Sequence, residues 1–117
     1  MSPCGRPSLS THVLDTEQGR PAAGVPIALT RLDGGPSALL ARDETDADGR
    51  IRDLGGAVIE PGLYRLEFDA AAYFRRQGGD APFLSKVTID FQIVGDGGHY
   101  HVPLLLSRYA CSSYRGS

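Results

Sequence analysis

Hydrophobic and polar residues alternate with period two along most of the chain, in short runs that turns separate. The alternation is clearest over residues 63–68 and 86–94, where every second side chain is apolar. Successive side chains of a strand point to opposite faces, so this pattern predicts strands that bury one face. Similar runs predict further strands at residues 9–15, 25–32, 37–45, 99–106 and 108–114. The chain is therefore expected to contain mostly short strands.

Glycine and proline interrupt this alternation at short intervals. The 117 residues include 15 glycines and 8 prolines, and turns spaced about every eight to twelve residues are typical of an all-β sandwich. One segment breaks the pattern: Asp69 is expected to cap a short helix over residues 70–77, which Gly78 ends. Residues 96–98 are expected to form a hairpin turn. The sequence predicts an antiparallel β-sandwich with one short helix.

Size, composition and charge are those of one folded domain. Hydrophobic residues make up 41% of the chain and charged residues 22%, which excludes a disordered tail protein and a disulfide-dense scaffold. The 12 basic and 14 acidic residues give no electrostatic footprint for nucleic acid. No membrane span or secretory signal is visible, so we expect a cytoplasmic protein without membrane partners. Residues 1–8 are expected to form a flexible leader before a domain of residues 9–117.

The candidate chemistry starts from three histidines. His99 and His101 share one face of a predicted strand and lie about 7 Å apart by strand rise. They could converge on one small ligand. A zinc site would need a third ligand, which His12 supplies only if its strand lies beside theirs. The other interpretation is that these histidines are solvated or have ordinary structural partners.

Two further polar positions have ordinary explanations when they are taken alone. Arg50 follows Asp-Gly in a turn, where a surface charge is common, and Tyr114 belongs to a C-terminal segment that would normally fray. The chain lacks the motifs of serine hydrolases, nucleotide-binding loops and zinc proteases. The residues by themselves leave the function open.

Three segments of the chain carry a resemblance to a known family. They are Leu-Ser-Thr-His-Val-Leu-Asp-Thr at 9–16, Thr-Asp-Ala-Asp-Gly-Arg at 45–50, and His-Tyr-His-Val-Pro-Leu-Leu-Leu-Ser at 99–107 with the C-terminal Tyr-Arg-Gly-Ser. Together they resemble the 5-hydroxyisourate hydrolases, the transthyretin-related enzymes of urate breakdown. The C-terminal motif is the most specific, because it separates these hydrolases from hormone-carrying transthyretin.

The resemblance implies a fold, an assembly and a reaction. The fold would be a prealbumin-like sandwich of two four-stranded sheets, assembled as a homotetramer with active sites in the channel between dimers. The reaction would hydrolyse 5-hydroxyisourate to 2-oxo-4-hydroxy-4-carboxy-5-ureidoimidazoline. Histidines would activate water for attack on the lactam carbonyl, and an arginine would stabilise the oxyanion, with no cofactor or metal.

The resemblance also implies which residues act. By position the catalytic residues are His12, Arg50, His101 and Ser117, and the substrate-binding residues are His12, Arg50 and Tyr114. It leaves open which histidine is the base. His99 has either a supporting or a purely structural role.

Two positions depart from the family pattern. Arg108 stands where the family usually has proline, which is expected to add a charge near the channel. Cys111 replaces a large side chain, which predicts a void in the last strand unless a neighbour fills it. The alternative function is a non-enzymatic binding module, such as a carrier of a small aromatic ligand. The joint presence of His12, His101 and the C-terminal motif argues against that alternative.

Overall fold

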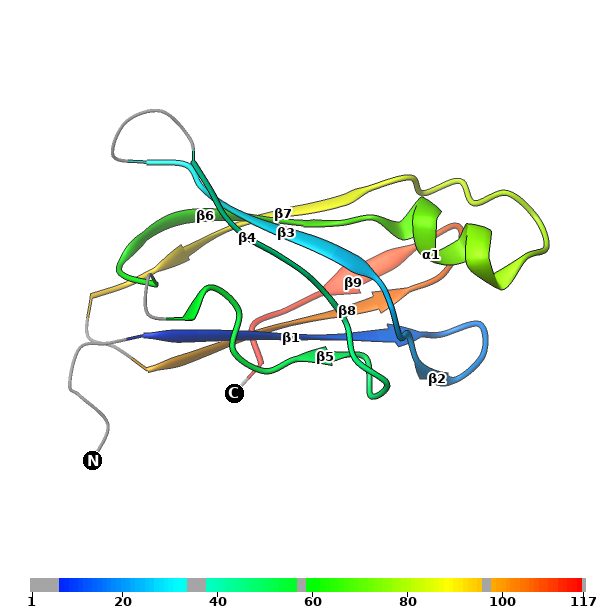
Figure 1. The fold of residues 1–117 in the computed structure, drawn as a ribbon, viewed down its shortest axis with the longest axis horizontal. Coiled ribbons are helices and arrows are strands. Elements are labelled where there is room, and N and C mark those ends of the chain that lie inside the picture. The colour runs from blue at the N-terminus through cyan, green and yellow to red at the C-terminus, as the bar shows by residue number, and fades with distance from the viewer. Residues whose placement is uncertain (1–6, 34–37, 57–58, 96–97, 117) are drawn as a thin grey trace.

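Two β-sheets pack face to face, with one helix at an end of the molecule (Figure 1). The computed structural model describes residues 7–33, 38–56, 59–95 and 98–116. The two-sheet sandwich with one short helix is as predicted. The expected leader falls largely on residues 1–6, which lie outside the described residues.

One sheet carries the candidate site, and we call it the histidine sheet. It consists of β1 (Ser8–Asp15), β2 (Arg20–Pro21), β5 (Arg50–Ile51), β8 (His99–Leu106) and β9 (Cys111–Ser113). The other sheet has the order β4-β3-β6-β7 and consists of β3 (Pro26–Arg31), β4 (Ala38–Glu44), β6 (Gly62–Phe68) and β7 (Val87–Ile93). The histidine sheet has five strands where four were expected, because two short strands, β2 and β5, both pair with β1.

The connection from β7 to β8 is not the predicted hairpin. β7 is an edge strand of one sheet, whereas β8 lies in the other sheet and runs parallel to β1. The register sets Ser10 opposite His101 and His12 opposite Pro103. Residues 96–97 of the expected turn lie outside the described part of the chain. The turn sequence could not specify which sheet would receive the next strand.

The core lies between the inner faces of the two sheets. On β6 the alternating residues Tyr64, Leu66 and Phe68 are fully buried, as predicted. β7 fits the prediction less closely, because Ile89 and Phe91 are only partly buried on this edge strand. Each large apolar side chain that is fully buried contributes roughly 1.5–3 kcal/mol. This core fixes which side chains of β1 and β8 face outward.

The helix α1 (Ala70–Gln77) begins and ends where its capping residues predict. The Asp69 carboxylate accepts a hydrogen bond of 3.0 Å from the backbone N–H of Ala72, and Gly78 ends the helix with a positive φ of 76°. No helix among the described residues combines the length and the apolar character needed to cross a membrane.

Arg108 has a different place from the one expected. Its guanidinium lies over the ring of Phe74 and pairs with Glu17 at 2.6 Å, and it donates hydrogen bonds to the carbonyls of Gly78 and Asp80. Arg108 thus gives hydrogen-bond partners to carbonyl groups near the C-terminal end of α1. It follows β8 at the end of the strand opposite to His99 and His101. It adds no free charge beside them.

Cys111 does not leave a void in the last strand. Its side chain is exposed on β9, at the edge of the histidine sheet, so no core space depended on it. The expectation of a packing defect was therefore wrong. The sequence could not show that this position faces solvent.

Candidate active site

A tight turn before β5 presents Arg50 to the histidine sheet. The Asp46 carboxylate accepts hydrogen bonds of 2.9 Å from the backbone N–H groups of Asp48 and Arg50. Gly49 has a φ of +74°, and a Cβ there would stand 2.5 Å from the Val13 carbonyl oxygen. Glycine is required at this position both by the backbone conformation and by the close approach to β1. The turn places Arg50 opposite His12 in the pairing of β1 and β5.

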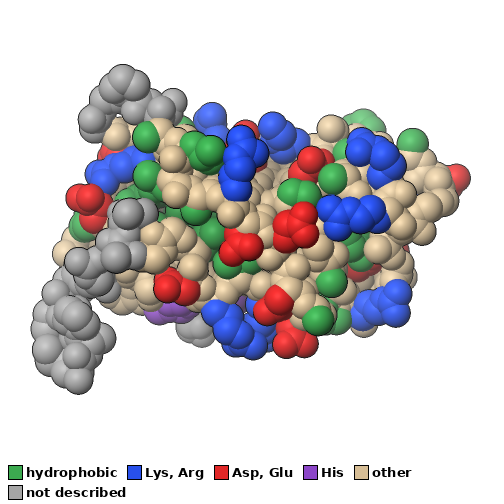
Figure 2. Space-filling view, viewed as in Figure 1, with side chains coloured by type: hydrophobic (Ala, Val, Ile, Leu, Met, Phe, Trp, Pro, Cys, Tyr) green, Lys and Arg blue, Asp and Glu red, His purple; other side chains and the backbone are tan. Residues whose placement is uncertain are grey.

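The polar residues gather on the outer face of the histidine sheet. The inner positions of β1 hold the buried Leu9 and Val13, so Ser10 and His12 point outward. The parallel register with β8 puts His101 on the same outward face as these residues. Figure 2 shows histidine atoms at the lower edge of the molecule beside basic side chains. Segments far apart in the sequence thus form one polar face.

A shallow cavity of about 260 Å³ opens on this face. Its lining residues are Ser10, Thr11, Arg50, Ile51, Arg52, His99 and His101. Two of the predicted catalytic residues, Arg50 and His101, therefore line one cavity. Among the described residues Arg50 forms no ion pair, so its guanidinium can bind an oxygen anion.

His12 lies beside this cavity with one ring nitrogen free. Its Nε2 is buried and has no hydrogen-bond partner among the described residues. Burial and the nearby positive charge of Arg50 lower the pKa of His12. The backbone of Asp48 raises the pKa of His12, but this influence is weaker than burial. Together these influences favour the neutral form of the ring, in which one nitrogen carries a lone pair.

His101 is held by a serine that the sequence analysis did not single out. The Ser10 hydroxyl lies 2.7 Å from Nδ1 of His101 and 2.7 Å from Nε2 of His99. The Ser8 hydroxyl lies 2.6 Å from Nδ1 of His99. Burial, and then the charges of His12, His99 and Arg50, lower the pKa of His101. His101 is thus a second neutral imidazole on this face.

The C-terminal segment reaches the same site through Gly116. The Gly116 N–H donates a hydrogen bond of 2.7 Å to the His101 carbonyl, and its Cα packs against the His101 ring. Tyr114 lies instead in a second pocket of about 270 Å³, beside Tyr100 and Phe91, and its side chain is 61% exposed. The single chain does not bring Tyr114 into the histidine cavity. Ser117 lies outside the described residues.

The three histidines do not form the zinc site considered from the sequence. Nowhere in the described residues do three His, Cys, Asp or Glu side chains lie where they could hold one metal ion. His99 and His101 both turn a ring nitrogen toward the Ser10 hydroxyl. The arrangement is a hydrogen-bonded chain between neighbours.

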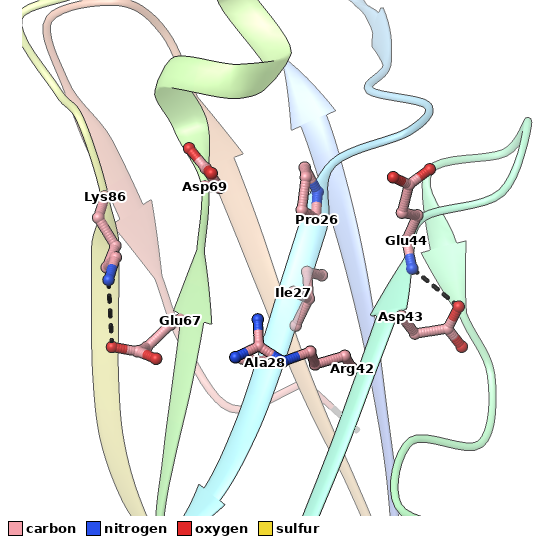
Figure 3. Close-up of a pocket in the computed structure, with 9 residues that line it drawn as sticks. All are labelled: Pro26, Ile27, Ala28, Arg42, Asp43, Glu44, Glu67, Asp69 and Lys86. Atoms are coloured by element: carbon pink, nitrogen blue, oxygen red, sulfur yellow. Dashed lines mark hydrogen bonds and ion pairs between the residues drawn. The ribbon is translucent and has the colours of Figure 1, made fainter. Parts of the chain in front are cut away.

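A pocket of about 410 Å³ on the outer face of the other sheet has a different character (Figure 3). Its charged side chains partly neutralise one another, since Lys86 pairs with Glu67 at 3.6 Å. Its lining includes no histidine and no cysteine. This pocket therefore lacks the imidazoles that the histidine face offers.

The sequence missed Ser8, Ser10 and Gly116 as parts of the site. Period two puts both serines on the same face of β1 as His12, which was a usable signal. Their contact with His99 and His101 follows only from the pairing of β1 with β8. The close approach of Gly116 to an imidazole has no local sequence signal.

Comparisons with known proteins point in one direction. The sequence model of the HIUase/Transthyretin family matches residues 9–116. A 5-hydroxyisourate hydrolase of Caulobacter vibrioides is 47% identical over 112 residues, which cover 93% of this chain and 97% of that protein.

Solved structures give the same relationship. The 5-hydroxyisourate hydrolase of Klebsiella pneumoniae superposes with a TM-score of 0.83 at 39% identity, covering 95% of this chain and 99% of that one. Transthyretin from Sparus aurata has a TM-score of 0.83 at 32% identity, covering 95% and 97%. Both similarities span nearly the whole domain.

Proposed function

Because the chain belongs to the HIUase/Transthyretin family, we propose that it hydrolyses 5-hydroxyisourate, as the names of its bacterial relatives indicate. The observation that carries the proposal is that His12, His101 and Arg50 lie on one face of the histidine sheet, where Arg50 and His101 line one cavity. Opening of the lactam ring needs an activated water, a proton for the leaving nitrogen and a group that stabilises the oxyanion. The site offers one residue for each task.

His12 acts as the general base in this proposal. Its Nε2 has no hydrogen-bond partner among the described residues, and in this proposal Nε2 carries the lone pair. The lowered pKa keeps the ring unprotonated at working pH. In this proposal Nε2, which is buried in the free chain, takes a proton from the attacking water once substrate binding admits water to it. General base catalysis of this kind supplies about 10²–10⁴-fold in rate.

Arg50 and His101 serve the other two tasks. The guanidinium of Arg50 lines the cavity beside the ring of His101 and stabilises the oxyanion of the tetrahedral intermediate. His101 bonds Ser10 through Nδ1, which leaves Nε2 to donate a proton to the leaving ring nitrogen. The product is 2-oxo-4-hydroxy-4-carboxy-5-ureidoimidazoline. The residues complete this reaction without a cofactor.

The C-terminal residues and a homotetramer complete the proposal. Tyr114 is exposed and lies outside the histidine cavity of the single chain, so we assign it to substrate binding in the assembled protein. A role for Ser117 is supported by the contact of its neighbour Gly116 with the His101 ring. The histidine cavity is shallow in one chain, and a second chain packed over it would exclude water. A cytoplasmic location stays a prediction from the sequence.

The alternative of a ligand carrier follows from the similarity to transthyretin. A carrier has no need for a desolvated imidazole with a free lone pair, which costs about 1–3 kcal/mol when it is buried unpaired. Such costs are usually tolerated where the group reacts. The site therefore favours catalysis over transport.

The test is to generate 5-hydroxyisourate in place with a urate-oxidising enzyme and to follow the decay of its ultraviolet absorbance. The protein is expected to accelerate this decay strongly over the spontaneous rate. Decay at the spontaneous rate, from a sample shown to be folded and tetrameric, would refute the hydrolase. Binding of the substrate without turnover would favour the carrier.

A further inference from the structure

Four side chains on the histidine sheet form a continuous chain of hydrogen bonds. It runs from Ser8 to His99 at 2.6 Å, from His99 to Ser10 at 2.7 Å, and from Ser10 to His101 at 2.7 Å. His99 is exposed, whereas Ser10 is only 8% exposed. The chain therefore connects solvent at one end with the reacting imidazole at the other.

The chemistry of the Ser10 hydroxyl restricts the direction of these bonds. A hydroxyl has one proton to donate, yet Ser10 contacts two ring nitrogens, so it donates to one and accepts from the other. When Nε2 of His99 carries a proton, that nitrogen donates to Ser10. Ser10 then donates to Nδ1 of His101, and the proton of neutral His101 lies on Nε2. That is the tautomer an acid needs for protonating the leaving nitrogen.

We propose that Ser10 and His99 form a proton relay that supplies His101 during ring opening. The inference rests on the proposed hydrolase function and deepens it. His101 gives its Nε2 proton to the leaving nitrogen as the C–N bond breaks. At the same time Nδ1 of His101 takes the proton of the Ser10 hydroxyl, and Ser10 takes the Nε2 proton of His99. His99 ends neutral and His101 stays neutral throughout.

The proton balance of the whole hydrolysis agrees with a proton that moves from His99 toward His101. The attacking water loses one proton to His12 and contributes its oxygen to the new carboxylic acid, which ionises at neutral pH. The leaving nitrogen gains one proton from the relay, so each turnover releases one proton in total. The exposed end of the chain of hydrogen bonds gives the leaving nitrogen a proton source that is separate from the proton taken up by His12.

Three variants separate a relay from a merely structural contact. Ser10→Ala removes the bridging hydroxyl, and Ser10→Thr retains it. His99→Gln keeps a hydrogen-bonding group at the exposed end of the chain of hydrogen bonds, but an amide cannot transfer a proton as an imidazole does. Ser85→Ala, at an exposed serine without a side-chain bond among the described residues, is the matched control. We expect kcat to fall about tenfold in Ser10→Ala and His99→Gln, the equivalent of one hydrogen bond. Ser10→Thr should lose less than Ser10→Ala, because it keeps a bridging hydroxyl, and the control should keep the wild-type value.

The decisive readout is chemical rescue by free imidazole. Imidazolium in the buffer can replace the missing proton source, so increasing its concentration should raise kcat of both impaired variants and leave the wild type unchanged. Nitrogen NMR should also show the Nε2–H tautomer of His101 in the wild type and its loss in Ser10→Ala. Unchanged kcat in both variants, or a loss that imidazole does not restore, would overturn the relay while the hydrolase stands. An inactive wild type would overturn both.

Discussion

Replacement of Gly116 by alanine tests whether the C-terminal segment holds His101 in place. A Cβ at this position would stand 2.7 Å from Cδ2 of the His101 ring and 3.3 Å from its Cγ and Cβ. Real Cβ atoms do not approach a ring carbon as closely as 2.7 Å, so either the imidazole or the segment has to move. Both belong to the candidate site.

The size of the effect follows from this overlap. Carbon atoms pack at about 3.5–4.0 Å, so relief requires a shift of nearly 1 Å. A misplacement of about 1 Å in an active site can cost about 10²-fold in rate. We therefore expect kcat/KM for 5-hydroxyisourate to fall about 100-fold in Gly116→Ala, or roughly 2.7 kcal/mol of transition-state stabilisation. The free energy of unfolding should change little, because Gly116 lies at the edge of the sheet.

The assay compares Gly116→Ala with Gly95→Ala. A Cβ at Gly95 meets no atom within 4 Å, and the φ of this residue is not in the left-handed region, so the control should retain full activity. Imidazole NMR signals of His101 then show whether the ring moved, and amide exchange at residues 111–116 shows whether the segment lifted instead. Wild-type kcat/KM in Gly116→Ala, with unchanged His101 signals, would refute the packing argument.

Three further predictions concern charge and stability. Arg50→Gln removes a positive charge that lowers the pKa of both His12 and His101. NMR titration should therefore show both pKa values rising, while burial, the larger cause of the lowering, remains. Unchanged pKa values would contradict this prediction. Tyr73→Phe deletes a hydrogen bond of 2.7 Å to the buried Asp15 carboxylate. Urea denaturation should show an unfolding free energy lower by about 2 kcal/mol. An unchanged value would show that this hydrogen bond makes no net contribution to stability. Arg108→Gln breaks the ion pair with Glu17 and two hydrogen bonds to carbonyls near the end of α1. It should lower the unfolding free energy by about 2 kcal/mol at fixed protein concentration, and kcat should not change. A loss of kcat without a loss of stability would place Arg108 in the site.

Much of the fold could be predicted because local patterns decided it. Alternation over 63–68 assigned the buried face of β6 correctly, and Asp69 with Gly78 gave both ends of α1. The sheet that receives β8 could not be read from a turn sequence. Pairing between segments about 90 residues apart depends on packing of the whole core, which no local window contains.

The candidate site, like the fold, could be predicted from the sequence only in part. His12, Arg50 and His101 were identified by resemblance, and the structure brings them onto one face. The contact of His101 with the Ser10 hydroxyl and the burial of His12 Nε2 depend on tertiary geometry and were not foreseen. The charge of Arg108 was expected near the channel, but long-range partners fix it elsewhere.

The most direct test of the account compares His12→Asn with the wild type in the decay of 5-hydroxyisourate at pH 7.5. Asparagine keeps a polar side chain at this position but cannot accept a proton from water at this pH. We predict that kcat falls at least 100-fold while the variant stays folded, because general base catalysis of this kind supplies about 10²–10⁴-fold. Hydrolysis by His12→Asn at the wild-type rate would contradict the assignment of His12 as the base.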